Sequence, residues 1–383
     1  MELERIYYQD PLVREFAARV LDCRQTPRGW EVDLDRTAFY PGGGGQHCDT
    51  GFLSGVRVLE AWEADEQVVH LCDAPLAVGD TVTGRLDYDR RLDGMQQHTG
   101  EHILAGLIFR QFGYHNVGFH MGAEFVEVDF DGPIPPDALE DLERRANQLV
   151  WQNIPLRTWT PAPEELPGIP YRTKKDLQWP VRLVQIPGVD CCACCGVHTA
   201  STGQVGLIKV LSCVKFHQGV RLEVVCGGRA YDYVNQILRQ NRLISHTLSA
   251  PMLETASAAV RLQEQLSREK FRATGLEKRV LGYISESYVN SEDVVHIEPA
   301  LEPGAVRALA EQIAGRCSGV AVVLGGDAPC NLCAIGDPER VRVLGEALRR
   351  ELRARGGGRN GAFQGSVDAP REQIEAVIRK VLQ

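Results

Sequence analysis

The sequence predicts an α+β protein of several domains, because two hydrophobic periodicities alternate along a chain too long for one core. The chain has 383 residues, whereas a single hydrophobic core stops growing at about 250–300 residues. Alternation with a period of two, typical of half-buried strands, dominates residues 1–90, and helical spacing begins at Met95. We expect a small β-barrel, an α+β domain, a long helical arm and a C-terminal α/β domain, at 1–90, 91–228, 229–288 and 289–383.

The predicted barrel is based on strand-like patterns without a long helical period. Residues 30–35 (WEVDLD) alternate strictly between apolar and polar side chains, and apolar clusters follow at residues 56–59 and 68–71. A small closed sheet is the most economical way to bury one face of such short strands.

The second domain combines helices with short strands. Residues 95–112 carry apolar side chains at helical spacing and end before Gly113, and residues 125–130 alternate again as a strand. A second helix is predicted to start at residues 135–137 (PPD), and its apolar positions fall on one face. Further strands are expected at residues 181–186, 206–211 and 221–225.

The remaining chain is predicted to be helical and then α/β. Residues 230–284 are charged and nearly free of helix breakers, which indicates one or two extended helices with a locally basic character. Buried strands are expected at residues 319–324 and 332–335. Amphipathic helices are expected at residues 341–352 and 374–381.

Composition and charge exclude several classes of protein. No apolar run approaches the roughly 20 residues that span a bilayer, and the N-terminus lacks the pattern of a secretion signal. We therefore expect a cytoplasmic protein, whose twelve cysteines are metal ligands, core residues or nucleophiles before they are disulfides. The net charge of −9 argues against non-specific nucleic-acid binding but allows a partner on a local basic face.

Two pairs of metal-binding residue types stand out. His98 and His102 are four residues apart in a predicted helix, so their side chains lie one above the other on one face. Cys194 and His198 repeat this spacing further along the chain. Together the pairs offer three nitrogens and one sulfur, a tetrahedral set that suits Zn²⁺. The sequence therefore predicts one zinc ion per chain.

The other cysteines leave one alternative open. Cys192 and Cys195 are close enough to Cys194 in the sequence to replace it as a ligand. Cys330 and Cys333 form a single C-x-x-C motif at the edge of an apolar run, where a buried strand is favoured over a redox or zinc site.

Two glycine-rich stretches also need an explanation. Residues 42–45 are four consecutive glycines, which indicates a backbone that needs positive φ or a close approach by another group. Residues 356–361 could hold phosphate through bare backbone amides. Neither stretch has the Lys-Ser/Thr ending of a P-loop or the dinucleotide fingerprint, so nucleotide hydrolysis and Rossmann redox chemistry are poorly supported.

The pattern H-x-x-E-H at His98–His102 also occurs in inverzincin metalloproteases, where Glu101 would be the general base. A protease site needs an open coordination position and a carboxylate ligand. The pair of Cys194 and His198 would close the tetrahedron with protein atoms alone, which argues against this alternative.

Taken together, these motifs resemble the AlaX-type alanyl-tRNA editing proteins, which are free-standing relatives of the editing domain of alanyl-tRNA synthetase. The resemblance covers nearly the whole chain. The C-terminal part of the chain resembles the DHH-associated domain of the long AlaX class. The sequence departs from the usual pattern at Gly42, commonly acidic, and at residues 194–198 (CCGVH), usually C-G-G-T-H. The segments that carry it are residues 37–46 (TAFYPGGGGQ), 95–102 (MQQHTGEH), 194–198, 202–206 (TGQVG) and 226–230 (CGGRA).

The resemblance implies a zinc-dependent hydrolase that removes serine, with glycine as a second candidate, from wrongly charged tRNA(Ala). Such a second site is needed because a pocket for alanine cannot exclude glycine by size or strongly reject a side chain that adds a hydroxyl. The zinc would hold the tRNA 3′ end and polarise the ester or its attacking water.

The resemblance also assigns roles to residues. Thr37 would hydrogen-bond the serine hydroxyl, and Gln46 would point into the same pocket. Gly43, Gly44 and Gly45 would let the aminoacyl end approach the backbone. Together with Thr37 and Gln46, Glu101 completes the expected catalytic residues.

A second hypothesis is a zinc-stabilised RNA-binding protein without catalysis, which complete ligation by protein atoms permits. We expect tRNA(Ala) as the partner, no membrane, and possible homodimerisation through the arm or the C-terminal domain.

Overall fold

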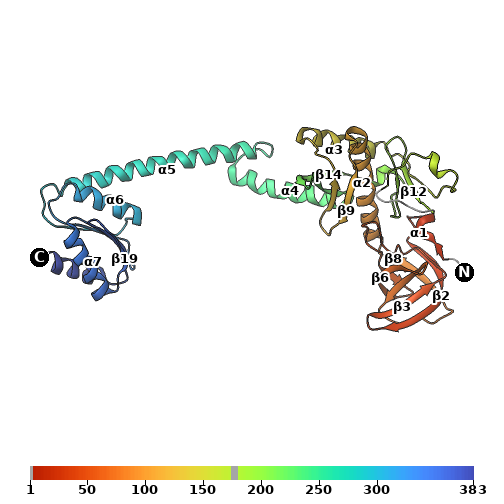
Figure 1. The fold of residues 1–383 in the computed structure, drawn as a ribbon, viewed down its shortest axis with the longest axis horizontal. Helices are drawn as coiled ribbons and strands as arrows, with labels where there is room; N and C mark the ends of the chain where they lie inside the picture. The colour runs from red at the N-terminus through yellow and green to blue at the C-terminus, as the bar shows by residue number, and fades with distance from the viewer. Residues whose placement is uncertain (1–2, 174–179) are drawn as a thin grey trace. The chain divides into compact units, whose positions relative to one another are not determined.

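The computed structural model describes residues 3–173 and 180–383, which divide into two compact units, Met1–Leu243 and Ile244–Gln383 (Figure 1). Helices and several separate sheets occur together, so the prediction of an α+β chain with more than one domain is confirmed. The boundaries of the four predicted domains stay a prediction. Among the described residues, no helix combines the length and apolarity that crossing a bilayer would need.

The N-terminal unit begins with a closed barrel of six antiparallel strands in the order β2-β3-β7-β6-β5-β8. Apolar residues of alternate strand positions fill its interior, among them Val20, Leu34 and Val58. The short elements β1 (Glu4–Arg5), α1 (Ile6–Gln9) and β4 (Arg36–Thr37) lie beside it. The barrel strands are β2 (Glu15–Thr26), β3 (Gly29–Leu34), β5 (Gly51–Leu53), β6 (Val56–Ala64), β7 (Gln67–Cys72) and β8 (Thr81–Leu86).

The long helix α2 (Tyr88–Phe112) follows the barrel and begins seven residues before the predicted start at Met95. Its first turn is charged, so hydrophobic periodicity does not reveal it. Arg91 holds this turn in place, because its buried guanidinium donates to both carboxylate oxygens of Asp49 and to the carbonyls of Pro11 and Ala38.

Helix α2 forms the centre of the second half of this unit. Its middle turns are buried on nearly all sides, and Ile103, Leu107 and Ile108 pack into one core with two sheets and α3 (Pro136–Trp151). One sheet has the order β14-β15-β10-β9 and the other β11-β12-β13. Their strands are β9 (Asn116–Met121), β10 (Val126–Phe130), β11 (Arg157–Trp159), β12 (Leu183–Ile186), β13 (Asp190–Ala193), β14 (Ile208–Phe216) and β15 (Gly219–Cys226). Two 3₁₀ turns lie at Leu166–Gly168 and Thr202–Val205.

The predicted arm consists of two helices, α4 (Gly227–Leu248) and α5 (Thr255–Glu286), separated at residues 249–254 by a segment that contains Pro251. Proline cannot donate the backbone hydrogen bond that a continuous helix would require there.

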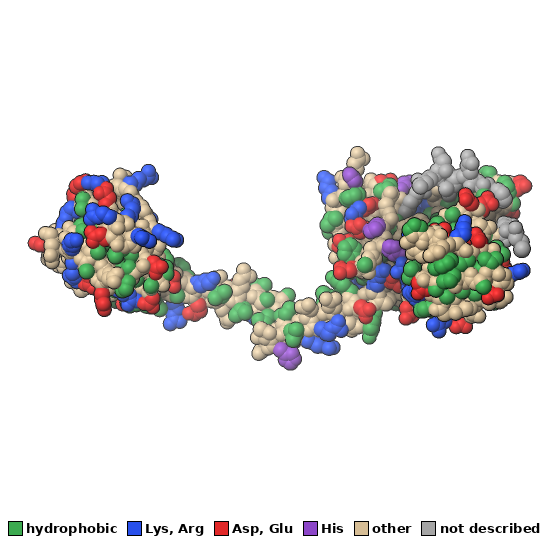
Figure 2. Space-filling model, turned by 90° about the horizontal axis from the view of Figure 1, so that it is seen from below, with side chains coloured by type: hydrophobic (Ala, Val, Ile, Leu, Met, Phe, Trp, Pro, Cys, Tyr) green, Lys and Arg blue, Asp and Glu red, His purple; other side chains and the backbone are tan. Residues whose placement is uncertain are grey.

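The C-terminal unit contains a five-stranded sheet in the order β16-β17-β18-β20-β19. Helix α6 and the end of α5 cover one face, and α7 and α8 cover the other. Cys330 and Cys333 are both buried on β18 and pack on opposite faces, so the preference for structural cysteines there is confirmed. Lys and Arg side chains are interspersed with Asp and Glu over the surface of this unit (Figure 2). Its elements are β16 (Val294–Glu298), α6 (Pro303–Ala314), β17 (Ala321–Gly325), β18 (Cys330–Ile335), α7 (Pro338–Leu352), β19 (Arg355–Gly357), β20 (Ala362–Val367) and α8 (Arg371–Leu382).

Candidate metal centre

The structure brings together the four predicted metal ligands. His98 and His102 project from successive turns of α2, and the segment that follows β13 carries Cys194 and His198 to the same point. One ligand atom from each of the four lies within 4.8 Å of those from the other three, and three of the four residues are buried.

The spacing of these atoms fits a zinc tetrahedron. The Cys194 Sγ lies 3.5 Å from Nε2 of His98 and 3.4 Å from Nε2 of His198. Zinc bonds of about 2.3 Å to sulfur and 2.0–2.1 Å to nitrogen, at tetrahedral angles, place a sulfur and a nitrogen about 3.5 Å apart. The residues present therefore fit a zinc ion in both donor type and size.

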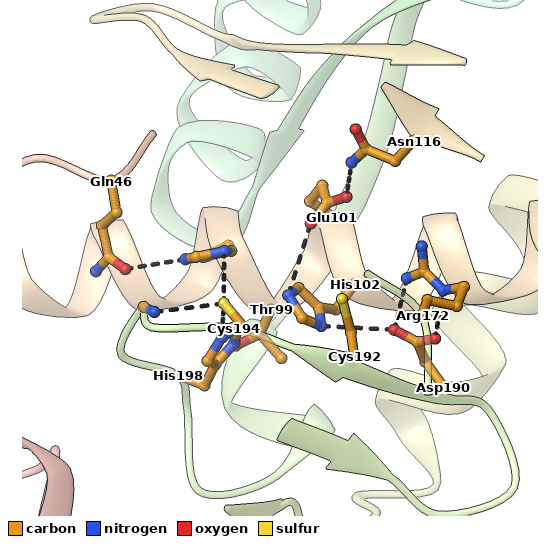
Figure 3. Close-up of polar contacts among 12 residues, drawn as sticks. Gln46, Thr99, Glu101, His102, Asn116, Arg172, Asp190, Cys192, Cys194 and His198 are labelled. Atoms are coloured by element: carbon orange, nitrogen blue, oxygen red, sulfur yellow. Dashed lines mark hydrogen bonds and ion pairs between the residues drawn. The ribbon is translucent and has the colours of Figure 1, made fainter. Parts of the chain in front are cut away.

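The outer nitrogen of each imidazole faces a polar partner, which is the usual environment of a metal-binding histidine (Figure 3). His98 Nδ1 lies 2.9 Å from Gln46 Oε1, and His198 Nδ1 lies 3.2 Å from Thr99 Oγ1. His102 Nδ1 lies 3.5 Å from Asp190 Oδ2. These contacts orient the three rings so that the other nitrogen points to the centre of the cluster.

The electrostatic environment favours a thiolate at the cluster. Burial alone would raise the pKa of Cys194, but the imidazoles of His98 and His198 and hydrogen bonds from His102 and His198 hold that pKa well below its usual value. Burial, together with the neighbouring His98, lowers the pKa of His198 to about 3. Thiolate and neutral imidazole are the forms that bind a metal ion.

Among residues 3–173 and 180–383, one alternative group is found, made of His102, Asp190 and Cys192. Burial raises the pKa of Cys192 to about 11, which favours the neutral thiol. Arg172 donates two hydrogen bonds of 2.7 Å to the Asp190 carboxylate, so that carboxylate already has a cationic partner. Neither observation favours this group over the first, and Cys195 belongs to neither.

The glycine-rich loop lies directly beside the cluster. Gly43, Gly44 and Gly45 all have positive φ, as the run of glycines indicates. A Cβ on Gly45 would lie 2.4 Å from the Phe119 ring, so only glycine fits there. The loop ends at Gln46, whose Oε1 lies beside His98 and also accepts from the Val197 backbone at 3.2 Å.

A small hollow of about 150 Å³ opens onto the cluster. Glu101 lies in its wall, and Asn116 donates to one of its carboxylate oxygens. The other oxygen lies 3.9 Å from Nε2 of His102. The full lining is Gly44, His98, Glu101, His102, Arg172, Thr173, Cys192, Ala193, Cys194 and Cys195.

Thr37 is placed differently from the other predicted site residues. It is fully buried, and its hydroxyl lies 2.8 Å from Nε2 of His70 and accepts from the Phe39 backbone. It does not line the hollow beside the cluster. A contact with substrate would require the hydrogen bond to His70 to open, and the role of Thr37 stays a prediction.

Four polar residues around the cluster were not identified from the sequence. Thr99 on α2 and Asp190 on β13 contact proposed ligands, and Asn116 on β9 contacts Glu101. Arg172, in the segment before β12, contacts Asp190. Thr99 directly follows a predicted ligand and Asp190 directly precedes the cysteine cluster. These positions in the sequence could have indicated that both residues lie near the site. Arg172 and Asn116 carry no local signal, because only the fold brings them near.

Comparison with known proteins places these features in context. Residues 181–222 match the family model described as the threonyl and alanyl tRNA synthetase second additional domain. The alanyl-tRNA editing protein AlaX-L of Pyrococcus horikoshii is 28% identical over 399 residues, which cover 100% of this chain and 98% of that protein. The alanyl-tRNA editing protein Aarsd1 of Danio rerio is 25% identical and covers 97% and 96% of the two chains.

Synthetases are also similar, over part of their length. The alanine–tRNA ligase of Pyrococcus abyssi is 30% identical over 99% of this chain, which corresponds to 44% of the ligase. The chain thus spans less than half of that enzyme but nearly all of each editing protein.

Proposed function

Because the chain belongs to the AlaX-type alanyl-tRNA editing proteins, we propose that it hydrolyses the aminoacyl ester of mischarged tRNA(Ala). Serine is the proposed amino acid, with glycine as a second substrate. The relatives that match over almost their entire length are named as alanyl-tRNA editing proteins, which supports an editing role that is separate from charging.

One observation carries the proposal: the three imidazoles and one thiol converge next to a carboxylate in a hollow large enough for a small amino acid. The hollow of about 150 Å³ lies below the about 300–1,000 Å³ typical of pockets that enclose a whole drug-sized ligand. It therefore suits the aminoacyl group rather than the nucleotide that carries it.

His98, His102, Cys194 and His198 are the proposed ligands of one zinc ion. When bound, zinc would supply positive charge that polarises an ester carbonyl or a water molecule. Gln46, Thr99 and Asp190 support this role by fixing the orientation of the three rings.

Glu101 is the proposed proton acceptor. One of its oxygens is held by Asn116, so the carboxylate has a fixed orientation in the wall of the hollow. A water molecule in the hollow would lie within hydrogen-bonding reach of the other oxygen, which could take its proton during attack on the ester. Gly44 also lines the hollow, where its missing side chain leaves room for the aminoacyl group.

The proposal is tested by incubating the metal-loaded protein with seryl-tRNA(Ala), glycyl-tRNA(Ala) and alanyl-tRNA(Ala) and measuring release of the amino acid. We expect release of serine, less release of glycine, and little release of alanine. Glu101→Gln is the matched variant, because it keeps the shape and one acceptor of the side chain and removes the base. It should reduce the rate by about 100-fold or more and retain the metal.

Release of serine no faster than by chelated protein would contradict the proposal. The remaining hypothesis would then be a zinc-stabilised RNA-binding protein without catalysis.

A further inference from the structure

A second, larger hollow shares a wall with the hollow beside the metal centre. It measures about 970 Å³, and Ala193, Cys194 and Cys195 line both hollows. It lies within the N-terminal unit, and its other walls come from residues 3–8, the β6–β7 hairpin, Thr160 and residues 180–182, which precede β12. Anything bound in it would lie next to a proposed metal ligand.

Size separates what the two hollows can hold. The larger volume lies near the upper end of the about 300–1,000 Å³ range of ligand pockets, whereas the smaller one lies below that range. A nucleoside joined to a small amino acid therefore cannot enter the smaller hollow as a whole. It fits if the amino acid occupies the smaller hollow and the nucleoside occupies the larger one.

The wall between the hollows is fixed by Tyr8 and Arg182. The Arg182 guanidinium lies over the Tyr8 ring at 4.5 Å and donates to the carbonyls of Cys194 and Gly196. The Tyr8 hydroxyl donates to the Cys195 carbonyl at 2.9 Å. An aromatic ring and a guanidinium are the groups on which nucleobases stack, and here both are tied to the segment that carries Cys194.

The β6–β7 hairpin supplies a side chain that can form hydrogen bonds with the edge of a nucleobase. Gln67 lines the hollow, and its carboxamide makes no hydrogen bond to the described residues. A glutamine carboxamide can donate to one ring nitrogen of adenine and accept from its exocyclic amino group at the same time. Beside it, Asp65 and Glu66 both have positive φ, a strained turn for residues other than glycine or asparagine.

Charge in this hollow disfavours ligands with several phosphates. Its lining carries three carboxylates, Glu63, Asp65 and Glu66, and two guanidinium groups, Arg5 and Arg182, of which Arg5 pairs with Glu63 at 2.7 Å. The lining therefore has an excess of one negative charge, which disfavours a triphosphate relative to a nucleoside at the end of a chain, which carries one phosphodiester.

On the basis of the proposed function, we propose that this hollow binds the terminal adenosine of the aminoacylated tRNA, with Tyr8 stacking on the base and Gln67 reading its edge. Both are binding residues for the substrate. The base then holds the ester at the shared wall, next to Cys194.

The test measures deacylation of seryl-tRNA(Ala) and, separately, calorimetric binding of 3′-seryl-amido-3′-deoxyadenosine, which cannot be hydrolysed. Tyr8→Leu and Gln67→Ala should each raise KM and weaken binding of the analogue by roughly 5- to 100-fold. Gln67→Ala should keep kcat within about twofold of wild type, whereas Tyr8→Leu also removes the hydrogen bond to the Cys195 carbonyl. Gln25→Ala is the matched control, because Gln25 is an exposed glutamine on β2 of the same barrel. Gln25→Ala should leave KM, kcat and the affinity for the analogue unchanged.

Gln67→Ala should also reduce the preference for tRNA ending in CCA over tRNA ending in CCG. Circular dichroism and metal content establish that the variants are folded, and Tyr8→Phe, which retains the ring, should keep most of the affinity. Unchanged KM and unchanged analogue affinity in both Tyr8→Leu and Gln67→Ala would overturn the inference while leaving hydrolysis by wild type intact.

Two further outcomes are informative. If wild type fails to hydrolyse seryl-tRNA(Ala), the proposed function fails, and loss of analogue binding in Gln67→Ala would still support the adenosine site. If ATP displaces the analogue with comparable affinity, the hollow is a site for free nucleotides and the inference is wrong.

Discussion

Cys194 and Cys195 are adjacent in the sequence but differ in their surroundings. Cys194 Sγ lies within 3.5 Å of two imidazole nitrogens, whereas Cys195 is exposed and lies against the glycine loop. We predict that Cys194→Ala loses the bound metal and the activity, and that Cys195→Ala keeps the metal. Elemental analysis of the purified variants measures this directly, and the reverse pattern would assign the ligand to Cys195.

His70 makes the stability of the barrel depend on pH. Burial lowers its pKa to about 4, and its two nitrogens face the Val32 carbonyl and the Thr37 hydroxyl. The folded protein keeps the ring neutral, while the unfolded chain takes up a proton below its ordinary pKa of 6.5. The contribution of His70 to the free energy of unfolding is therefore fully present above pH 6.5. It falls by about 3 kcal/mol as the pH drops to 4.

Urea unfolding of wild type and His70→Asn between pH 4 and 7.5 tests this prediction. The difference between the two proteins isolates His70 from the metal-site histidines, which titrate in both. A difference in unfolding free energy that does not change with pH would contradict it.

At the residue level, the sequence predicted that His98, His102, Cys194 and His198 lie together, because His and Cys residues at a spacing of four form a local pattern. It placed Gln46 near the site through the resemblance, and the structure gives Gln46 a contact with His98. The pairing of Thr37 with His70 could not be predicted, because the two residues are distant in the sequence and meet only through barrel closure.

At the level of elements, the glycine loop between β4 and β5 allows a test of whether its contact with Phe119 is needed for activity. Gly45 and Gly55 have nearly equal φ, +89° and +92°, but a Cβ would meet Phe119 at the first and nothing within 4 Å at the second. Alanine at either position should cost about 1–3 kcal/mol of backbone strain. Only Gly45→Ala should also displace Gln46 and reduce deacylation, by about tenfold or more.

Chemical unfolding and steady-state kinetics on both variants measure the two effects separately. Equal activity of Gly45→Ala and Gly55→Ala would show that the contact with Phe119 does not position the loop.

Most elements could be predicted from periodicity, since strands and amphipathic helices differ in their repeat. The predicted start of α2 was wrong by seven residues. The first turn is held by the ion pair of Arg91 with Asp49 and not by apolar packing, so hydrophobic periodicity does not reveal it. Whether the arm was one helix or two could not be decided from its charged sequence, and the structure shows two.

For the whole molecule, the two units have separate hydrophobic cores, so each has what it needs to fold alone. We predict that a chain ending at Leu248 keeps its metal and its rate at saturating seryl-tRNA(Ala), and binds tRNA more weakly, with a smaller dependence on salt. Ending the chain between α4 and α5 is preferable to ending it near residue 290, because Leu281 of α5 packs into the C-terminal core. Unchanged tRNA affinity in filter binding would show that residues 249–383 do not contribute to tRNA binding.

Homodimerisation stays a prediction at this scale. Helix α5 exposes large apolar side chains, and sedimentation equilibrium of Leu266→Glu against wild type tests whether they associate. These side chains are Val260, Leu262, Leu266, Phe271, Leu276, Val280 and Tyr283.

The order of barrel, α+β part, helices and α/β part follows from the sequence because each pattern is local. The grouping into two compact units does not, because contacts between elements, such as those of α2 with both neighbouring sheets, have no signature in periodicity.

The side chains that orient the three imidazoles originate in separate parts of the N-terminal unit: Gln46 in a barrel loop, Thr99 in α2 and Asp190 in β13. An ion held by those imidazoles would therefore fasten the barrel to the helix and to the second sheet, in addition to any part in the reaction. Chelation should then accelerate amide hydrogen exchange first in residues 42–48 and 191–199, while the barrel strands keep their protection.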